Sequence, residues 1–452
     1  MRFIDLFAGL GGFHKALHEL GHECVFVSEL DPVLRENYKR NWGNNINIHG
    51  DIKKIVKENI DLIPDHDILC AGFPCQPFSK AGKQLGRKDE RGTLFDEIVK
   101  ILEAKTPKYF ILENVRFIAK HNNEETWKAM KAEFQRLGYD VDHNDYSPHD
   151  FGIPQHRQRI FIVGALGKNA LSHFSFEEID KRKKPVIDLA NFIEENPSGY
   201  KKLPKANQAC IKLWQELIDA LPKETGLPGF PIWGMEFGAD YPFEEDYPSL
   251  LSQRQLSGYK GNFGISLKGM TREEQFANLP SYARVEDKFP DWKRQYIKKN
   301  RAFYADNKKF IKDVVNRIAE LPSQSWQKLE WNVGTEGKRK INKYILQFRA
   351  SGIRVKKADF FPSLVCTNTQ IPIIGWENRY ITRKEGLKLQ SLNGLSLPEN
   401  DTAAFKALGN AVNAKIVKLI AANLLVEERK VNGVSSRHIK SNSISKAYES
   451  AA

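Results

Sequence analysis

The sequence contains no long apolar run and has few cysteines. None of its 452 residues lies in an uninterrupted apolar stretch of about 18, the length of a membrane-spanning helix. The first apolar segment includes Asp5 and is followed by Lys15, with no small-residue cleavage site, so no signal peptide is expected. The five cysteines, at positions 24, 70, 75, 210 and 366, lack the paired spacings of zinc sites and disulfide frameworks. We expect a reduced, cytoplasmic protein without a metal site.

Positive charge is in excess and is concentrated in one stretch. The chain has 69 Lys and Arg against 56 Asp and Glu, a formal net charge of +13. Residues 288–360 hold 19 of these basic residues and 7 acidic ones. The same stretch contains seven aromatic residues: Trp292, Tyr296, Phe303, Tyr304, Trp326, Trp331 and Tyr344. Basic side chains interleaved with aromatic ones favour a nucleic acid partner, although a solvated helical face gives the same pattern.

Length and periodicity predict two domains, the first of them α/β. Within the first 165 residues, strands are predicted at 3–7, 24–29, 67–71, 109–112 and 159–163, and helices at 13–20, 33–41, 93–104 and 125–137. Such alternation predicts a doubly wound, mostly parallel sheet. The rhythm stops after Gly167 and returns near Arg379. We expect a first domain at 1–167, a smaller irregular domain at 168–378, a segment at 379–428 that returns to the first domain, and a flexible tail at 429–452.

A Gly-rich turn joins the first predicted strand to the first predicted helix. The turn contains Gly9, Gly11 and Gly12, and Glu29 follows at the end of the second strand. Glycines let a ligand approach the backbone, and a carboxylate at that spacing can bind ribose hydroxyls. A plain tight turn is the alternative. Asp5, just before the glycines, could take the amino group of S-adenosylmethionine, a group that NAD lacks.

Candidate catalytic residues follow three other predicted strands. Cys75, in AGFPCQPFSKAG, lies in a loop after a buried strand, where a thiolate can act as a nucleophile; a lone cysteine can equally be an inert packing residue. Glu113 ends the strand KYFILENV, where burial would raise its pKa. In GIPQHRQRIFIVGA, alternation places Arg157 and Arg159 on one face of the chain. Asp51 would end a third strand of the sheet.

Taken together, these motifs resemble the DNA (cytosine-5) methyltransferases, and among them the methylases of type II restriction-modification systems. The motifs are FAGLGG, Glu29, Asp51, PCQ, ENV, QHRQR and a late GN. The resemblance covers about the first 165 residues, the last segment from Arg379 to Leu425, and FRASGIRVKKADFFPSLV between them. It implies a Rossmann-like domain dependent on S-adenosylmethionine, joined to a variable target-recognition domain.

The resemblance also assigns residues to the cofactor. It implies that Phe7 and the three glycines hold the methionine part, that Glu29 binds the ribose, and that Leu30, Asp51 and Ile52 frame the adenine. Leu94, Asn410 and Val412 would close the pocket. Ala411 departs from the GNSV that most members carry, so the role of that serine hydroxyl is absent here.

For the reaction, the resemblance implies covalent catalysis without a metal. The Cys75 thiolate would add to C6 of a cytosine flipped out of the duplex, Glu113 would share a proton with N3, and Arg159 would contact the carbonyl side of the ring. After methyl transfer to C5, S-adenosylhomocysteine is left as the product.

The implied partner is double-stranded DNA, with a cognate restriction endonuclease acting on the same site. We expect a monomer in a bacterial cytoplasm that interacts with no membrane. Three rival hypotheses remain at this point: a tRNA cytosine-5 methyltransferase, a non-catalytic DNA-binding relative, and a Rossmann-type oxidoreductase. The oxidoreductase leaves PCQ and QHRQR unexplained.

Overall fold

The computed structural model describes residues 1–43, 46–73, 94–120, 124–284, 288–364 and 370–425. It divides the chain into two compact units. Unit 1 comprises Met1–Asn196, Asp359–Asn368 and Arg383–Ala452, and unit 2 comprises Pro197–Ala358 and Thr369–Thr382. The boundary therefore falls beyond the expected residue 167, and a short stretch near residue 360 joins unit 1 because Phe361 pairs with Gln155 in a two-stranded ladder.

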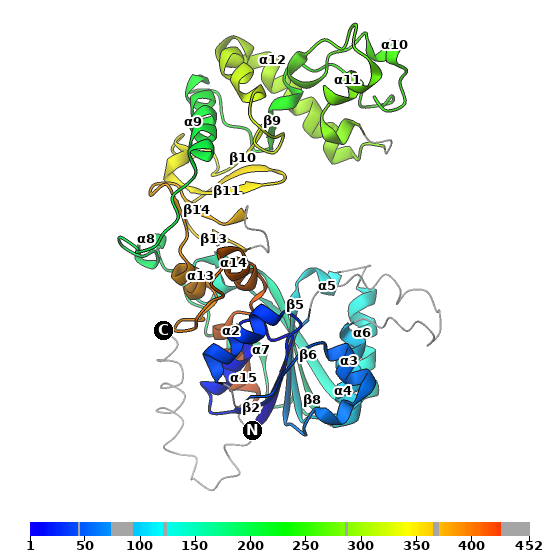
Figure 1. Ribbon diagram of the computed structural model, residues 1–452, viewed down its shortest axis with the longest axis vertical. Helices are drawn as coiled ribbons and strands as arrows, with labels where there is room; N and C mark the ends of the chain where they lie inside the picture. The colour runs from blue at the N-terminus through cyan, green and yellow to red at the C-terminus, as the bar shows by residue number, and fades with distance from the viewer. Residues whose placement is uncertain (44–45, 74–93, 121–123, 285–287, 365–369, 426–452) are drawn as a thin grey trace. The chain divides into compact units, whose positions relative to one another are not determined.

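Unit 1 contains most of the regular elements of the chain (Figure 1). They are β1 (Arg2–Leu6), α1 (Gly12–His18), β2 (Glu23–Ser28), α2 (Pro32–Trp42), β3 (Ile48–His49), α3 (Ile52–Glu58), η1 (Ile60–Leu62), β4 (Ile68–Gly72), α4 (Leu94–Lys105), β5 (Tyr109–Val115), α5 (Phe117–Lys120), α6 (Glu125–Arg136), β6 (Tyr139–Tyr146), η2 (Pro148–Asp150), β7 (Gln155–His156), β8 (Arg159–Leu166), α7 (Phe176–Asp180), α8 (Leu189–Phe192), β13 (Phe361–Pro362), α13 (Arg383–Leu389), α14 (Asp401–Asn410) and α15 (Ala414–Leu424).

The main sheet of unit 1 has seven strands in the order β3-β2-β1-β4-β5-β8-β6. The first five are parallel, and β8 runs antiparallel to both of its neighbours. The predicted α/β class is thus confirmed, and each predicted strand is present within a few residues. The pattern did not predict β6, because its sequence YDVDHNDY is polar and half exposed at the edge of the sheet. Since parallel strands end at one edge of the sheet, the residues that follow β1, β2 and β5 lie along that edge.

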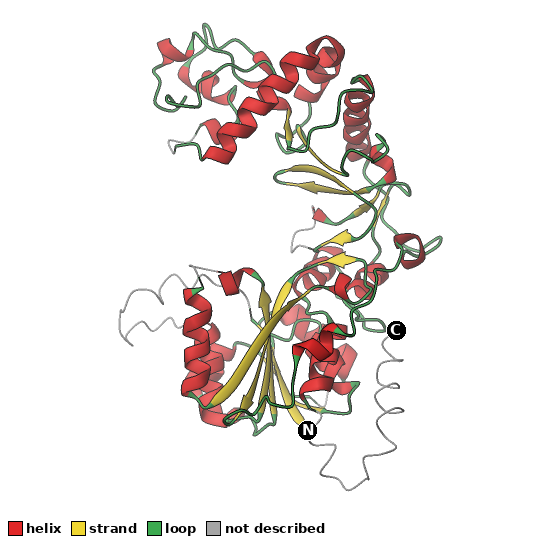
Figure 2. Ribbon diagram, turned by 180° about the vertical axis from the view of Figure 1, so that it is seen from behind, coloured by secondary structure: helices red, strands yellow, loops and turns green. Residues whose placement is uncertain are grey.

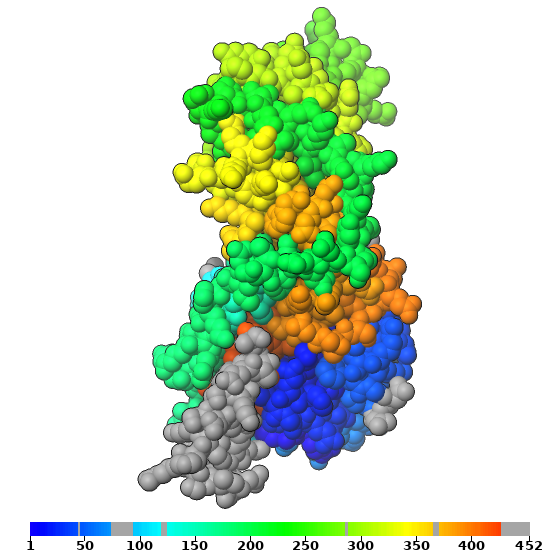
Figure 3. All heavy atoms as spheres, turned by 90° about the vertical axis from the view of Figure 1, so that its left-hand side faces the viewer, coloured from blue at the N-terminus to red at the C-terminus, as the bar shows by residue number. Residues whose placement is uncertain are grey.

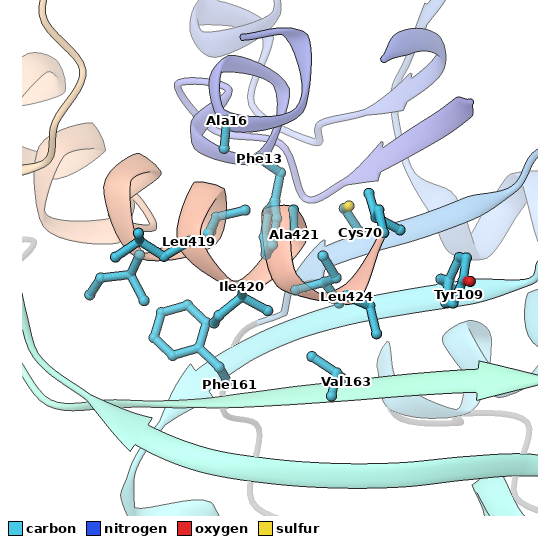
Figure 4. Packing of buried hydrophobic residues seen from close by; sticks show 14 of the residues in the cluster. Phe13, Ala16, Cys70, Tyr109, Phe161, Val163, Leu419, Ile420, Ala421 and Leu424 are labelled. Carbon is cyan, nitrogen blue, oxygen red and sulfur yellow. The ribbon is translucent and has the colours of Figure 1, made fainter. Parts of the chain in front are cut away.

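Helices cover both faces of this sheet (Figure 2). On one face α1 and α15 pack against it, and Figure 4 shows Ile420 and Leu424 of α15 directed at the strands. On the other face lie α3, α4 and α6, with Ile98, Ile101 and other side chains fully buried. This burial of apolar side chains stabilises the sheet and, with it, the edge at which the parallel strands end.

Residues from the end of the chain complete unit 1. Figure 3 shows the segment before α14 lying beside the N-terminal residues. There the Asn37 side-chain amide donates to the Ser396 carbonyl at 3.1 Å, and the Lys418 ammonium lies 3.0 Å from a carboxylate oxygen of Glu19. Contacts across more than 350 residues therefore hold the first and last described segments together.

Unit 2 is built around a six-stranded mixed sheet in the order β15-β14-β11-β12-β10-β9. Its elements are α9 (Lys205–Ala220), β9 (Ile232–Trp233), η3 (Gly234–Glu236), α10 (Gln253–Leu256), η4 (Asn262–Gly264), α11 (Arg272–Ala277), η5 (Ser281–Ala283), α12 (Asp291–Ala319), β10 (Lys328–Asn332), η6 (Ile341–Lys343), β11 (Ile345–Arg349), β12 (Gly352–Lys356), β14 (Ile373–Ile374) and β15 (Arg379–Tyr380). Three of these strands are only two residues long, which is too short for an alternation of apolar and polar residues to predict them.

The aromatic residues of the basic stretch are mostly core residues of unit 2. Trp331 is buried, and five others are partly buried against the two hydrophobic clusters of the unit. Only Trp292, with 54% of its surface exposed, lies open. Packing within unit 2 therefore accounts for most of these aromatic side chains, and their contact with a nucleic acid stays a prediction. No helix in the part of the chain that the structure describes is long and apolar enough to cross a membrane.

Candidate active site

The Gly-rich turn begins where β1 ends and leads into α1. Phe7, Gly9 and Gly11 all have positive φ, at 56°, 55° and 80°. A Cβ added at Gly11 would lie 2.6 Å from the Trp42 indole nitrogen, and one at Gly12 would lie 2.5 Å from Val412. These two glycines are therefore required by close packing within the protein, whereas Gly9 faces open space.

Glu29 holds the turn against the end of β2. One of its carboxylate oxygens accepts from the Gly9 amide and the other from the Asp31 amide, each at 2.8 Å. The neighbouring Leu30 exposes 70% of its surface, and its carbonyl accepts from the Arg35 guanidinium at 2.8 Å. A carboxylate and an exposed apolar side chain thus stand side by side at this strand end.

Asp51 begins the next element along the same edge. It is the N-cap of α3, and its side chain accepts from the Lys53 amide at 2.9 Å. The Ser28 hydroxyl donates to the Gly50 carbonyl at 2.8 Å, which ties the loop before α3 to the end of β2. Ile52 follows with only 3% of its surface exposed.

These strand ends surround a cavity of about 970 Å³ within unit 1. Twelve of the predicted site residues line it: Phe7, Gly9, Glu29, Leu30, Asp51, Ile52, Leu94, Glu113, Arg157, Arg159, Asn410 and Val412. Asp5, Gly11 and Gly12 do not line it. Cys75 lies outside the described residues.

Glu113 is the carboxylate at the end of β5. It exposes 6% of its surface, and one of its oxygens lies 3.0 Å from the Arg159 guanidinium. Burial raises the pKa of Glu113, and the charges of Arg159 and Arg157 oppose that rise. Because the effect of burial outweighs that of the two arginines, this carboxyl group holds a proton at higher pH than a solvated one.

Arg157 and Arg159 line the cavity together, as their spacing predicted. Arg157 exposes 3% of its surface and donates to the Ala411 carbonyl at 3.1 Å. β8 begins only at Arg159, so Arg157 lies in the approach to the strand. Gln155, two residues before Arg157, is buried away from the cavity, where its side-chain oxygen accepts from the Gln390 amide at 3.3 Å.

Asn114 connects the end of β5 to the end of β4. Its side-chain amide donates to the Phe73 carbonyl at 3.0 Å, and its own oxygen accepts from the Val115 amide at 2.7 Å. Phe73 lies two residues before Cys75 in the sequence. Asn114 therefore fixes the backbone at the point where the PCQ loop begins.

Asp5 is buried beneath the Gly-rich turn. None of its surface is exposed, and the Tyr38 hydroxyl lies 3.4 Å from one of its oxygens. Tyr38 also lies 2.6 Å from a ring nitrogen of His14, which stacks on Trp42. Burial raises the pKa of Asp5 well above its ordinary value.

The pattern missed one wall of the cavity. Thr402, Ala403, Lys406 and Ala407 of α14 line it together with Asn410. Helical spacing of three or four residues back from Asn410 was the signal that would have found Ala403, Lys406 and Ala407. Within the described part of the chain no group of three His, Cys, Asp or Glu side chains is arranged to hold a metal ion.

Comparison with known proteins defines the class to which this fold and site belong. The profile of the family described as C-5 cytosine-specific DNA methylase matches residues 1–227. The chain therefore belongs to the C-5 cytosine-specific DNA methylase family and is a DNA (cytosine-5) methyltransferase, which confirms the resemblance drawn from the motifs.

Individual relatives match either less than half or nearly all of the chain. The type II methyltransferase M.HaeII of Haemophilus aegyptius is 46% identical over 203 residues, which cover 44% of this chain and 59% of that protein. M.NlaIV of Neisseria lactamica is 30% identical over 452 residues, covering 94% of this chain and 99% of its own. M.AluI of Cellulosimicrobium cellulans is 28% identical and covers 92% and 90%.

Proposed function

We propose that this protein transfers a methyl group from S-adenosylmethionine to C5 of cytosine within a specific duplex sequence. The proposal is carried by the cavity of unit 1, which brings the Gly-rich turn, Glu29 and Asp51 together with Glu113 and Arg159. Type II methyltransferases are relatives over nearly the whole chain, so we assign the protein to a restriction-modification system with a nuclease of the same specificity. We further propose that it acts as a monomer in the cytoplasm.

The residues of the cavity fit S-adenosylmethionine. The volume of about 970 Å³ lies at the upper end of the range for ligand pockets. The Glu29 carboxylate suits ribose hydroxyls, and Leu30 and Ile52 offer apolar surface to an adenine ring. Phe7, Leu94, Asn410 and Val412 complete the walls. When bound, this cofactor supplies an electrophilic methyl group on sulfur.

In the proposed reaction, Cys75 and Glu113 act on the cytosine ring. The thiolate forms a bond to C6, the electrons of the C5–C6 double bond move toward N3, and Glu113 provides the proton that N3 takes up. C5 would then form its bond to the methyl group while that group's bond to the cofactor sulfur breaks, which leaves S-adenosylhomocysteine. Loss of the C5 proton to solvent, with return of the N3 proton to Glu113, restores the double bonds of the ring and expels the Cys75 thiolate. The raised pKa of Glu113 supports its role as the proton donor.

The arginines would hold the ring while this occurs. Arg159 is paired with Glu113 and lines the cavity, so its guanidinium can face the ring carbonyl. Arg157 donates to the backbone of Ala411, next to the cofactor residues Asn410 and Val412. The C5 and C6 atoms are unreachable in a stacked duplex, so the base must be flipped out. We assign recognition of the surrounding sequence to unit 2.

A mechanism-based adduct tests the proposal. Full-length protein is incubated with S-adenosylmethionine and duplex DNA in which 5-fluorocytosine replaces cytosine, and is then run on a denaturing gel. Because fluorine cannot leave as the proton does, we expect a stable protein–DNA adduct that disappears in Cys75→Ser. An adduct that forms on tRNA and not on DNA would show that the substrate is RNA. The absence of an adduct on both would indicate a non-catalytic DNA-binding protein.

A further inference from the structure

The longest helix of unit 2 has one buried face and one exposed face. α12 buries Ile297, Ile311, Val315 and Ile318 in the unit. Asn300 anchors it further, since its side-chain oxygen accepts from the Trp233 amide at 2.7 Å. The helix is therefore firmly attached to unit 2, and its opposite face is a surface of fixed geometry.

The basic residues of α12 fall into two groups. Each of its three arginines forms an ion pair: Arg294 with Asp291, Arg301 with Glu236 and Arg317 with Glu216. Its six lysines are Lys293, Lys298, Lys299, Lys308, Lys309 and Lys312, and none of them forms an ion pair with any described residue. The arginine charges thus hold the protein together by ion pairs. Of the lysines, Lys293, Lys299 and Lys309 place their ammonium groups over aromatic rings, that of Lys309 lying 4.8 Å from the centre of the Phe310 ring, and none of the six is neutralised by a carboxylate among the described residues.

Three of these lysines form one stripe. At 100° per residue, Lys298, Lys309 and Lys312 lie within about 60° of one another around the helix axis. Ala302 and Ala305 lie between them on the same face, and all five side chains are exposed. We name these five residues the lysine stripe.

The dimensions of the lysine stripe suit a phosphate backbone. Lys298 and Lys312 are 14 residues apart, a rise of about 21 Å, which corresponds to roughly six base pairs of duplex. The small alanine side chains let a backbone approach the helix closely between the ammonium groups. Asp306 and Asp313, also exposed, lie at the side of the stripe, about 60° and 40° from Lys309 around the axis and about 80° and 60° from Lys298.

We propose that the lysine stripe of α12 binds the phosphate backbone of the DNA substrate without reading its sequence. The proposal rests on the function proposed above and names a surface by which unit 2 holds the duplex. Ammonium groups on flexible chains neutralise phosphates as point charges, and each contact releases counterions from the DNA. Contacts of this kind set affinity and position but carry no sequence information.

The test compares two triple variants of the full-length protein. In K298Q/K309Q/K312Q the stripe loses its three charges. In the control, K39Q/K181Q/K183Q, the same net charge is removed from exposed lysines that already pair with Glu36, Glu178 and Asp180. Glutamine keeps a helix propensity close to that of lysine, and thermal unfolding checks that both variants fold. Duplex binding is then measured over a range of KCl concentrations, on a duplex that carries the site located by the 5-fluorocytosine adduct and on the same duplex with that site scrambled.

The logarithm of the binding constant falls linearly with the logarithm of the salt concentration, and each phosphate contact contributes about 0.9 to the steepness of that slope. We expect the slope of the stripe variant to be shallower than that of the wild type by about 2.7, the value for three contacts. The ratio of affinities for the two DNAs should stay unchanged, and the control should keep the wild-type slope. An unchanged slope in the stripe variant, an equal loss in the control, or a loss confined to the recognition sequence would each overturn the proposal. A wild-type protein that binds no duplex overturns the proposed function and the stripe together, whereas wild-type binding with an unchanged variant slope overturns the stripe alone.

Discussion

At Gly11 and Gly12, side chains from distant parts of the sequence leave no room for any residue larger than glycine. The sequence predicted a ligand-binding turn at these glycines, but Gly11 packs on Trp42 and Gly12 on Val412, from segments 31 and 400 residues away. Gly9 alone meets the original expectation, because it lines the cavity. A motif identifies the turn, while the reason for each glycine depends on tertiary neighbours that no local pattern contains.

Gly11→Ala should lower the free energy of unfolding by more than Gly21→Ala. Both residues have φ near 80°, so each alanine costs about 1 to 2 kcal/mol in the left-handed region. A Cβ at Gly21 meets nothing within 4 Å, whereas one at Gly11 collides with Trp42 and Tyr38, which adds about 1 to 3 kcal/mol. Denaturant unfolding of the two variants measures the difference, and equal losses would show that the Trp42 contact yields at no cost.

Asp5→Asn should remove part of the pH dependence of stability. Because burial raises the pKa of Asp5 in the folded protein above 3.8, the stabilisation it gives is fully present below that value and is lost as pH rises through the raised pKa. The groups around it are His14, Tyr38, Glu29 and Cys24. We expect the Tm of the wild type to fall across this window relative to that of Asp5→Asn. Parallel Tm profiles would contradict a buried, proton-holding Asp5.

Glu113→Gln should lower kcat by about 10² to 10⁴, the usual contribution of a general acid or base. S-adenosylmethionine binding should remain close to wild type, because Glu29 and the cofactor loops are unchanged. Single-turnover methylation and equilibrium binding of the cofactor separate the two effects. The matched control is Glu58→Gln, an exposed carboxylate outside the cavity lining, which should leave both unchanged. A Glu113→Gln variant with wild-type kcat would exclude the proposed proton transfer.

At the scale of elements, periodicity predicted what is long and buried. The central strands β1, β4 and β5 were found because most of their positions are apolar and nearly all are buried. The edge strand β6 and the two-residue strands of unit 2 were not, since their pairing is decided by partners distant in sequence. Likewise, most aromatic residues of the basic stretch pack against the core of unit 2. The sequence could not show this, because a partly buried ring on an amphipathic helix has the same spacing as a ring that stacks on a base.

The attachment of η3 to α12 depends on a buried carboxylate. Glu236 has no exposed surface, and it accepts from Tyr241 and Tyr282 and pairs with Arg301 at 3.0 Å. Arg301→Ala leaves this charge buried without its cation, so we expect a loss of about 3 to 5 kcal/mol in the stability of unit 2. The double variant E236Q/R301M should lose less, because no charge is then buried. Unfolding of both variants in denaturant checks this order, and a double variant less stable than Arg301→Ala would reverse the interpretation.

At the scale of the whole molecule, unit 1 is assembled from distant parts of the chain. The core cluster on one face of its sheet combines Phe13 and Leu17 of α1 with Ile416, Ile420 and Leu424 of α15. The returning rhythm after Arg379 hinted at this arrangement, but only the structure gives the residues in contact. Without α15 this apolar face of the sheet would be open to water.

A chain ending at residue 382 should therefore fail to form a folded unit 1. Loss of α13 to α15 exposes the core cluster and removes the wall of the cavity that contains Asn410 and Val412. Co-expression of residues 1–382 with residues 383–452 should restore a soluble complex that binds S-adenosylmethionine. Copurification and calorimetric titration measure the result, and a folded, cofactor-binding 1–382 fragment would contradict the role given to α15.

The chain passes between the two units four times, after residues 196, 358, 368 and 382. Unit 2 is consequently a cassette made of two pieces, and the shorter piece provides β14 and β15, which complete the sheet through pairing of β14 with β11. If sequence specificity is exchanged between relatives, by recombination or by engineering, residues 197–358 and 369–382 must therefore be transferred together. A crossover that takes only the longer piece would join one lineage's β11 to another's β14, and such hybrids should be rare among functional descendants.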